Sequence, residues 1–261
     1  MNILDKIVAQ KKTEITEQKS KYPVALLEQS IYMQSPTISL VEYIRRPDKS
    51  GIIAEFKRKS PSKPSINLYA EVEEVTMGYM QSGASALSVL TDNHFFGGSN
   101  KDLSTARKFN YCPILRKDFV IDEYQILEAR SIGADAILLI AEILGPDDVE
   151  RLSKFAKSLD LEVLMELHSE DQLSKISEYV DLVGVNNRDL STFKTDINFS
   201  KELVNKLPSD VVKVSESGIS KPETIKELKA EGYEGFLIGE RFMSYPSPAQ
   251  ACMEFIKSIP A

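Results

Sequence analysis

The sequence has 261 residues, of which 42% are apolar and 27% charged, and its 32 Lys and Arg face 39 Asp and Glu, for a formal net charge of −7. The apolar share excludes a disordered chain, and an acidic balance without a Lys/Arg block argues against nucleic acid or an anionic membrane as the main partner. Two cysteines, Cys112 and Cys252, and two histidines, His94 and His168, argue against a disulfide framework and against a zinc centre.

The N-terminus, MNILDKIVAQKK, lacks the apolar core and the small-residue cleavage site of a signal peptide. The longest apolar run, AILLIA at 136–141, is too short to cross a bilayer. These features predict a globular, cytoplasmic protein without a metal ion.

The first 45 residues are predicted to be largely helical. Ile3-Leu4 and Ile7-Val8 form an apolar stripe, and charged residues fill the opposite face through about Lys19. A second helix is expected at 39–44.

After residue 45, short apolar runs alternate with longer amphipathic segments. The runs predict strands at 51–56, 85–90, 112–116, 135–140, 161–167, 181–185, 211–215 and 235–239. The amphipathic segments predict helices near 69–81, 100–109, 122–132, 146–158, 169–178, 199–206, 221–231 and 247–257. Continuous apolar strands indicate burial on both faces, as in a parallel sheet. Eight strand–helix units in about 210 residues fit a (β/α)₈ TIM barrel.

A doubly wound open sheet is the alternative to the barrel. Such a sheet normally has a Gly-rich turn after its first strand, and here that turn reads EFKRKSPSKPS, with no glycine. No linker or low-complexity stretch interrupts the chain. We therefore predict one barrel domain over residues 1–261, with a helical N-terminal extension at 1–45.

Polar residues follow several predicted strands, at the end of a barrel where active sites lie. Glu55 and Lys57 end the first strand and share a parity, so both can point inward. Lys117 ends the third strand, and Asn186 and Arg188 follow the sixth. Taken singly, a charged residue just past a strand is more often a solvated loop residue.

Glu166 differs because it lies inside the apolar strand LEVLMEL. A carboxylate there must be paired or functional, since an unpaired buried charge is costly. Lysines at two other strand ends can supply the partner. A glutamate and two lysines at one barrel mouth predict an acid/base set.

The loops after the last two strands, SESGIS at 215–220 and IGE at 238–240, combine glycines with residues that start helices. Many barrels hold a phosphate group there on backbone N–H groups. Either Gly218 or Gly239 alone could simply make a tight turn, but the two together favour a phosphate site. His168 follows the fifth strand and could contact substrate, although its position favours a loop or capping role. His94 lies in a DNHFFGGS loop that predicts either a lid or apolar packing.

Seven motifs, in this order and spacing, resemble the indole-3-glycerol phosphate synthase family over essentially the whole chain: AEFKRKSPSK, LSVLTDNHFFGGS, PILRKDFVIDEYQILEARSIGADAILLIA, EVLMELH, GVNNRDL, SESGI and FLIGE. The resemblance implies a single (β/α)₈ barrel whose N-terminal extension covers the active-site mouth. It also implies a carboxy-lyase of tryptophan biosynthesis. Its reaction would be the ring closure, decarboxylation and dehydration of 1-(2-carboxyphenylamino)-1-deoxyribulose 5-phosphate, without metal or organic cofactor.

The resemblance assigns acid/base roles to four residues. Lys117 would be the general acid and Glu166 a general base. Lys57 would bind the substrate and assist the acid chemistry, and Glu55 would orient the lysines. Which lysine serves which step stays open.

The remaining expected site residues position or bind the substrate. Asn186 and Ser217 complete the catalytic set, Asn186 by positioning the reacting groups and Ser217 next to the phosphate. The residues expected to line the pocket, lend charge or bind the phosphate are Ser60, Phe119, Leu138, Arg188, Gly218, Gly239 and, through its backbone N–H, Glu240. The implied partner is a small phosphorylated substrate, and neither nucleic acid nor a membrane is expected as a partner. The protein is expected to be a monomer. Contacts with other enzymes of the tryptophan pathway stay open.

Glu240 presents an electrostatic problem, because a carboxylate facing a phosphate dianion would repel it. We therefore expect its side chain to turn outward, with Arg241 or another base as partner.

Two other function classes remain open. A phosphoribosylanthranilate isomerase would need a Cys and Asp pair at the strand ends, and neither cysteine is expected there. A non-catalytic barrel would be expected to lose at least one of Lys57, Lys117 and Glu166, and all three are present.

Overall fold

The computed structural model describes residues 3–189, 192 and 194–260. Leu190, the last residue of the GVNNRDL motif, and the outermost residues of the predicted ranges 1–45 and 1–261 lie outside the described residues.

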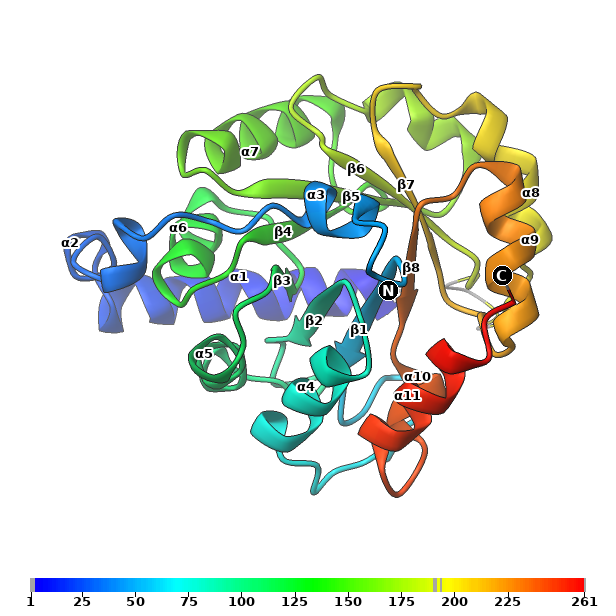
Figure 1. The fold of residues 1–261 in the computed structure, drawn as a ribbon. Helices are drawn as coiled ribbons and strands as arrows, with labels where there is room; N and C mark the ends of the chain where they lie inside the picture. The colour runs from blue at the N-terminus through cyan, green and yellow to red at the C-terminus, as the bar shows by residue number, and fades with distance from the viewer. Residues whose placement is uncertain (1–2, 190–191, 193, 261) are drawn as a thin grey trace.

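Eight parallel strands close into a barrel (Figure 1). Each strand pairs with the next along the chain, and the first pairs with the last. This closure confirms the predicted (β/α)₈ barrel and excludes the open sheet. The strands are β1 (Ile52–Phe56), β2 (Ala86–Leu90), β3 (Ile114–Lys117), β4 (Ala136–Ile140), β5 (Glu162–Leu167), β6 (Leu182–Asn186), β7 (Val212–Glu216) and β8 (Gly235–Ile238).

Helices follow the strands on the outside of the barrel. They are α4 (Val72–Gln81), α5 (Asn100–Phe109), α6 (Glu123–Ser131), α7 (Pro146–Ser158), α8 (Asn198–Leu203) with the 3₁₀ turn η3 (Val204–Lys206), α9 (Pro222–Glu231) and α11 (Pro248–Lys257). A short helix not expected from the sequence, α10 (Glu240–Met243), follows β8.

The helix predicted at 169–178 is wrong, because only a 3₁₀ helix, η2 (Glu170–Lys175), forms there. The connection from β5 to β6 is short and must return along the whole barrel wall. A 3₁₀ helix rises about 2.0 Å per residue and an α-helix about 1.5 Å, so the 3₁₀ form covers the distance with fewer residues. Lys175 fixes the segment by donating to Ala141 O at 2.7 Å and Leu144 O at 3.0 Å.

Alternate residues of each strand point into the barrel and pack there on one another. Ile53, Leu115 and Leu164 belong to this interior cluster. Because side chains alternate with period two, residues two positions further along the same strands point to the same side, at the C-terminal mouth. The inward parity predicted for Glu55 therefore also applies to Lys117 and Glu166.

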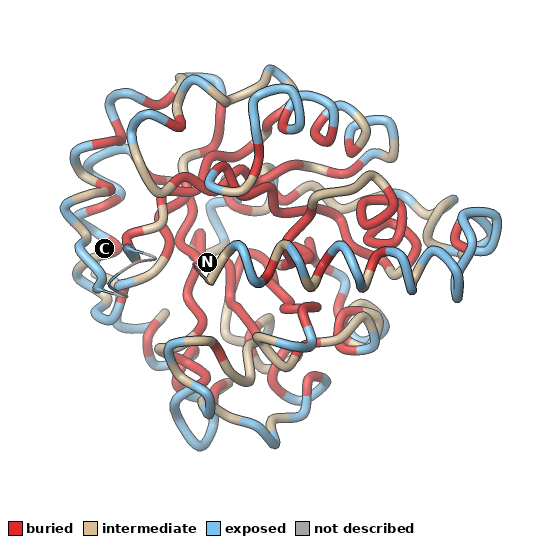
Figure 2. Tube along the Cα trace, turned by 180° about the vertical axis from the view of Figure 1, so that it is seen from behind, coloured by how far each residue is buried: buried red, intermediate tan, exposed pale blue. Residues whose placement is uncertain are grey.

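The N-terminal extension has helices at both ends of the barrel. It consists of α1 (Ile3–Lys21), α2 (Val24–Leu27), η1 (Ile31–Met33) and α3 (Leu40–Arg45). Glu162, the first residue of β5, accepts hydrogen bonds from Ser39 Oγ and Leu40 N, both at 2.6 Å, so α3 lies at the N-terminal ends of the strands. Helix α1 crosses the opposite end, in front of the barrel in Figure 2.

Within the described ranges, no helix has the length and apolar character that a bilayer crossing requires. Cys112 and Cys252 are both buried, and both are free thiols.

Candidate active site

A cavity of about 160 Å³ lies at the C-terminal mouth of the barrel. Strand ends and loops from around the barrel line it, together with the start of α1. Eleven of the thirteen residues predicted for the site are among its lining residues: Glu55, Lys57, Ser60, Lys117, Phe119, Leu138, Glu166, Asn186, Arg188, Ser217 and Glu240. Gly218 and Gly239 are not.

Lys117 lies between two carboxylates at the centre of the mouth. Its Nζ is 2.6 Å from Glu166 Oε2 and 2.8 Å from Glu216 Oε2. The pairing expected for the buried Glu166 is thus confirmed, with Lys117 as the partner. The Lys117 side chain is only 14% exposed, so this lysine is not the solvated loop residue that its position alone would suggest.

Within this triad, the pKa values of the two carboxyl groups shift in opposite directions. Burial disfavours the Lys117 ammonium, but Glu166 and Glu216 outweigh it and raise the pKa of Lys117 above its usual value. Burial also opposes ionisation of Glu166, yet Lys117 and His168 hold the pKa of Glu166 well below its usual range. For Glu216, burial and the Glu166 charge together raise the pKa to about 8. Near neutral pH, Glu216 therefore keeps its proton while Glu166 is ionised.

Glu216 is a site residue that sequence reasoning missed. It was visible only as part of the SESGIS loop, although it ends β7 at the same parity as the interior residues Val212 and Val214. The neighbouring strand makes room for it, because a Cβ at Gly184 would lie 2.1 Å from Glu216 Oε1. An acid at inward parity, next to a strand that has a glycine two positions before its end, was the available signal.

A second ion pair joins Lys57 and Glu55, with 2.6 Å between Nζ and Oε1. A Cβ at Gly239 would lie 2.5 Å from Glu55 Oε1. Gly239 thus leaves space for the Glu55 carboxylate. The sequence analysis had instead predicted that this glycine makes room for the phosphate group. The two lysines are paired separately, Lys57 with Glu55 and Lys117 with Glu166 and Glu216.

The Glu240 side chain was expected to turn outward, with Arg241 or another base as its partner, and its partners are other bases. Its carboxylate lies 3.2 Å from Arg188 Nη2 and 3.5 Å from Lys63 Nζ, and the side chain is 38% exposed. These cations reach it because the loops after β1 and β6 converge on the mouth where α10 begins. Arg241 instead donates to Ser220 O at 3.2 Å.

The turn after β7 takes an unusual backbone conformation. Ser217 and Gly218 both have positive φ, +66° and +75°. A side chain at Gly218 would be strained by that φ and would press on Thr195 at 3.3 Å. Asn187, 4% exposed, holds the turn by donating to Glu216 O at 3.0 Å and Ser217 O at 3.1 Å.

One side of the cavity is apolar. Ile3, Leu4 and Ile7 of α1 contribute to it, together with Phe119 and Phe96, whose ring centroids are 5.8 Å apart. Phe96 belongs to the DNHFFGGS loop, so this loop packs against the cavity wall. The cavity therefore offers charged groups on one side and an aromatic-sized apolar surface on the other.

His168 lines the cavity rather than only capping a loop. Its Nε2 lies 3.2 Å from Glu166 Oε1, and its side chain is 7% exposed. In the described part of the chain, no group of three His, Cys, Asp or Glu side chains is arranged to hold a metal ion.

Comparison with known proteins gives concordant matches. The family model "Indole-3-glycerol phosphate synthase" matches residues 4–255. A Bacteroides thetaiotaomicron protein named indole-3-glycerol phosphate synthase is 48% identical, over 99% of this chain and 99% of its own. A Prochlorococcus marinus protein of the same name is 42% identical, over 99% of this chain and 90% of its own.

Among solved structures, the tryptophan synthase alpha subunit of Legionella pneumophila superposes with a TM-score of 0.59 at 16% identity, covering 84% of this chain and 96% of its own. The thiamine phosphate pyrophosphorylase of Pyrococcus furiosus superposes with a TM-score of 0.60 at 15% identity, covering 82% of this chain and 98% of its own. At such low sequence identity, these two superpositions show a shared barrel fold and nothing about function.

Proposed function

The chain belongs to the indole-3-glycerol phosphate synthase family, and we propose that Lys117 and Glu166 perform the acid and base steps of the family's ring-closing reaction at the barrel mouth. The enzyme is a carboxy-lyase of tryptophan biosynthesis and acts on a small phosphorylated substrate. The observation that carries the assignment of roles is the placement of the Lys117 ammonium within 2.8 Å of two buried carboxylates in the cavity.

The first step joins an aromatic ring carbon of the substrate to its ribulose carbonyl carbon. Negative charge then develops on the carbonyl oxygen, where a protonated group is needed. The raised pKa of Lys117 keeps its ammonium protonated, which supports its role as the group that stabilises this oxygen and protonates it. Lys57, 18% exposed and held by Glu55, can bind the substrate and supply the second acid.

The later steps need a base. Loss of CO₂ returns an electron pair to the ring system. Loss of the hydroxyl group as water takes up a second proton, and one proton must leave as the new ring becomes aromatic. Two protons are delivered and one removed, so the overall reaction takes one proton from solvent. Glu166 is a weak base while Lys117 is charged. Its pKa rises once Lys117 has given up its proton, because the attracting charge is lost.

Charge at the mouth suits an anionic substrate. With Glu216 protonated, Glu55 and Glu166 are balanced by Lys57 and Lys117. Arg188 and Lys63 together carry one more charge than Glu240. This excess of positive charge supports Arg188 as the cation that attracts the phosphate group, next to Ser217 and the backbone of Glu240.

We further propose that, within the extension at 1–45, α1 is the part that covers the mouth, since Ile3, Leu4 and Ile7 line the cavity. The substrate's aromatic ring would lie against this apolar side. Phe119 and Leu138 would complete the contact. The cytoplasm, where phosphorylated metabolites occur, is the compartment that we propose.

A direct assay tests the function. The purified protein is mixed with 1-(2-carboxyphenylamino)-1-deoxyribulose 5-phosphate, and formation of the indole product is followed by its fluorescence. We expect steady turnover without added metal or cofactor. A protein that binds the substrate but leaves it unchanged would be a non-catalytic barrel and would contradict the proposal.

A further inference from the structure

The face of α1 that packs on the barrel contains a buried lysine. Ile7, Lys11 and Ile15 are the buried residues of this helix, and they follow one another at four-residue spacing. Residues four apart lie on one face of a helix, so Lys11 occupies the middle of an apolar stripe. It is 3% exposed. A lysine in this place must be compensated by charge.

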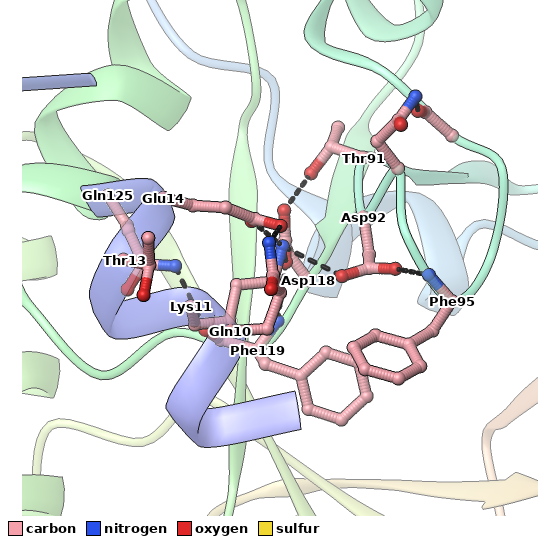
Figure 3. A network of polar contacts seen from close by, with 12 residues as sticks. Gln10, Lys11, Thr13, Glu14, Thr91, Asp92, Phe95, Asp118, Phe119 and Gln125 are labelled. Carbon is pink, nitrogen blue, oxygen red and sulfur yellow. Dashed lines mark hydrogen bonds and ion pairs between the residues drawn. The ribbon is translucent and has the colours of Figure 1, made fainter. Parts of the chain in front are cut away.

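Figure 3 shows the compensation. Lys11 Nζ lies 2.8 Å from Asp92 Oδ2, 2.8 Å from Asp118 Oδ1 and 2.8 Å from Glu14 Oε2. Asp92 follows β2 and Asp118 follows β3, so the lysine joins α1 to the ends of two neighbouring strands. Both aspartate side chains are almost fully buried, at 0% and 3% exposure.

The same carboxylates hold the backbone of the cavity wall. Asp92 Oδ1 accepts hydrogen bonds from Phe95 N at 2.7 Å and from Phe96 N at 3.0 Å. Asp118 Oδ1 accepts from Phe119 N at 2.8 Å. Phe96 and Phe119 form the aromatic part of the wall, and Asp118 directly follows Lys117 in the chain.

Neighbouring groups stabilise the charged forms of Asp118 and Lys11. Arg116 Nη2 lies 3.6 Å from Asp118 Oδ2, and Thr91 Oγ1 donates to the same oxygen at 2.5 Å. Burial disfavours the Lys11 ammonium, but Asp118 and Asp92 outweigh burial and raise the pKa of Lys11 above its usual value. Lys11 therefore stays charged at any pH at which the enzyme would be assayed.

We propose that Lys11 is a positioning residue for the reaction: it docks α1 on the loops after β2 and β3, so that Ile3, Leu4 and Ile7 of α1 close the cavity against Phe96 and Phe119. The inference rests on the proposed function. It assigns Lys11 to binding of the substrate's aromatic part, since Lys117 keeps its own carboxylate partners. Loss of Lys11 should therefore weaken substrate binding much more than it slows the chemical steps.

The test uses Lys11→Met, which keeps the length of the side chain and removes its charge. The matched control is Lys12→Met, at the exposed neighbouring position of the same helix. We expect Lys11→Met to raise KM about tenfold or more while kcat changes less than about threefold, as for the loss of an interaction made equally in ground and transition states. Amide hydrogen exchange of residues 3–21 should accelerate in Lys11→Met and stay unchanged in Lys12→Met.

A purely structural ion pair would give a different pattern. It would lower the folded fraction, and with it the apparent kcat, and it would accelerate exchange throughout the barrel rather than in α1 alone, while KM stayed as in the wild type; that result would overturn the inference. If Lys11→Met does not fold, Asp92→Asn replaces it, because its oxygen can still accept from Phe95 and Phe96 while the ion pair is lost. A smaller KM rise in the same direction is then expected, and an unchanged KM refutes the inference. An inactive wild type would overturn the proposed function itself.

Discussion

The carboxylate of Glu216 occupies the space into which a side chain at Gly184 would project. Gly184 pairs with Glu166 on β5 and with Val214 on β7, so β6 has no side chain between the two glutamates that contact Lys117. A Cβ at this position would lie 2.1 Å from Glu216 Oε1. The glycine therefore determines where the second carboxylate of the triad can sit.

Gly184→Ala should impair catalysis without unfolding the barrel. The added methyl group displaces Glu216 and, through it, the Lys117 ammonium, and a shift of about 1 Å at a reacting group can cost on the order of 10²-fold in rate. Gly145→Ala is the control, because a Cβ there meets nothing within 4 Å. Steady-state kinetics and thermal unfolding of both variants provide the measurement. Equal kcat in the two variants would contradict this account of Gly184.

Lys117→Met should remove most of the turnover. A positioned general acid typically contributes on the order of 10²–10⁴-fold. Since Lys117 is buried between two carboxylates, the variant should also lose more stability at pH 7 than at pH 5, where Glu166 can take up a proton. Turnover and urea denaturation at both pH values test this. Near-wild-type turnover would transfer the acid role to Lys57.

Glu166→Gln should stop the reaction late. The amide keeps the shape of the carboxylate but cannot accept the proton that leaves as the ring becomes aromatic. Rapid-quench experiments should then detect an accumulating ring-closed intermediate. A variant that merely raises KM, with turnover at saturation unchanged, would exclude Glu166 as the base.

Glu216 should give the protein a pH-dependent stability. Burial raises the pKa of Glu216 from its usual 4.5 to about 8. A carboxyl group with a raised folded-state pKa stabilises the fold fully below pH 4.5, and this contribution is lost as the pH rises to 8. Glu166, with its lowered pKa, loses its contribution only as the pH falls below 4.5.

The free energy of unfolding of the wild type, relative to Glu216→Gln, should therefore decrease from pH 5 to pH 8. Urea denaturation of both proteins at three pH values in this range measures it. A difference that does not vary with pH would mean that Glu216 is already ionised at pH 5.

Arg188→Met should weaken substrate binding selectively. Arg188 lies in the loop after β6 and contacts Ser62 and Glu240 at the mouth. Losing a charge-assisted contact to phosphate should raise KM about tenfold or more, equivalent to about 1.4 kcal/mol. Arg241→Met is the matched control, because Arg241 does not line the cavity. A similar KM in both variants would place the phosphate elsewhere.

The residues that end the strands could be predicted from the sequence because period two fixes which of them point inward. Glu55, Lys57, Lys117 and Glu166 all follow this rule, and the burial of Glu166 among apolar neighbours required a partner. Strand positions were predictable for the same reason, since fully buried strands have continuous apolar sequences.

The partners of Glu240 and Lys11 could not be predicted. The contacts of Glu240 with Arg188 and Lys63 depend on how three loops converge after the barrel has closed. Lys11 looked like part of the charged face of α1, although its four-residue spacing from Ile7 and Ile15 pointed to burial. Periodicity shows which way a side chain points but not what it meets there.

The position of α1 and α3 at opposite ends of the barrel also has a consequence for the order of assembly. Synthesis proceeds from the N-terminus, so α1 and α3 leave the ribosome before any strand. The binding site of α3 includes Glu162 at the start of β5, and α1 needs the ends of β2 and β3. Both helices therefore lack their partners until the strands that hold them have been made.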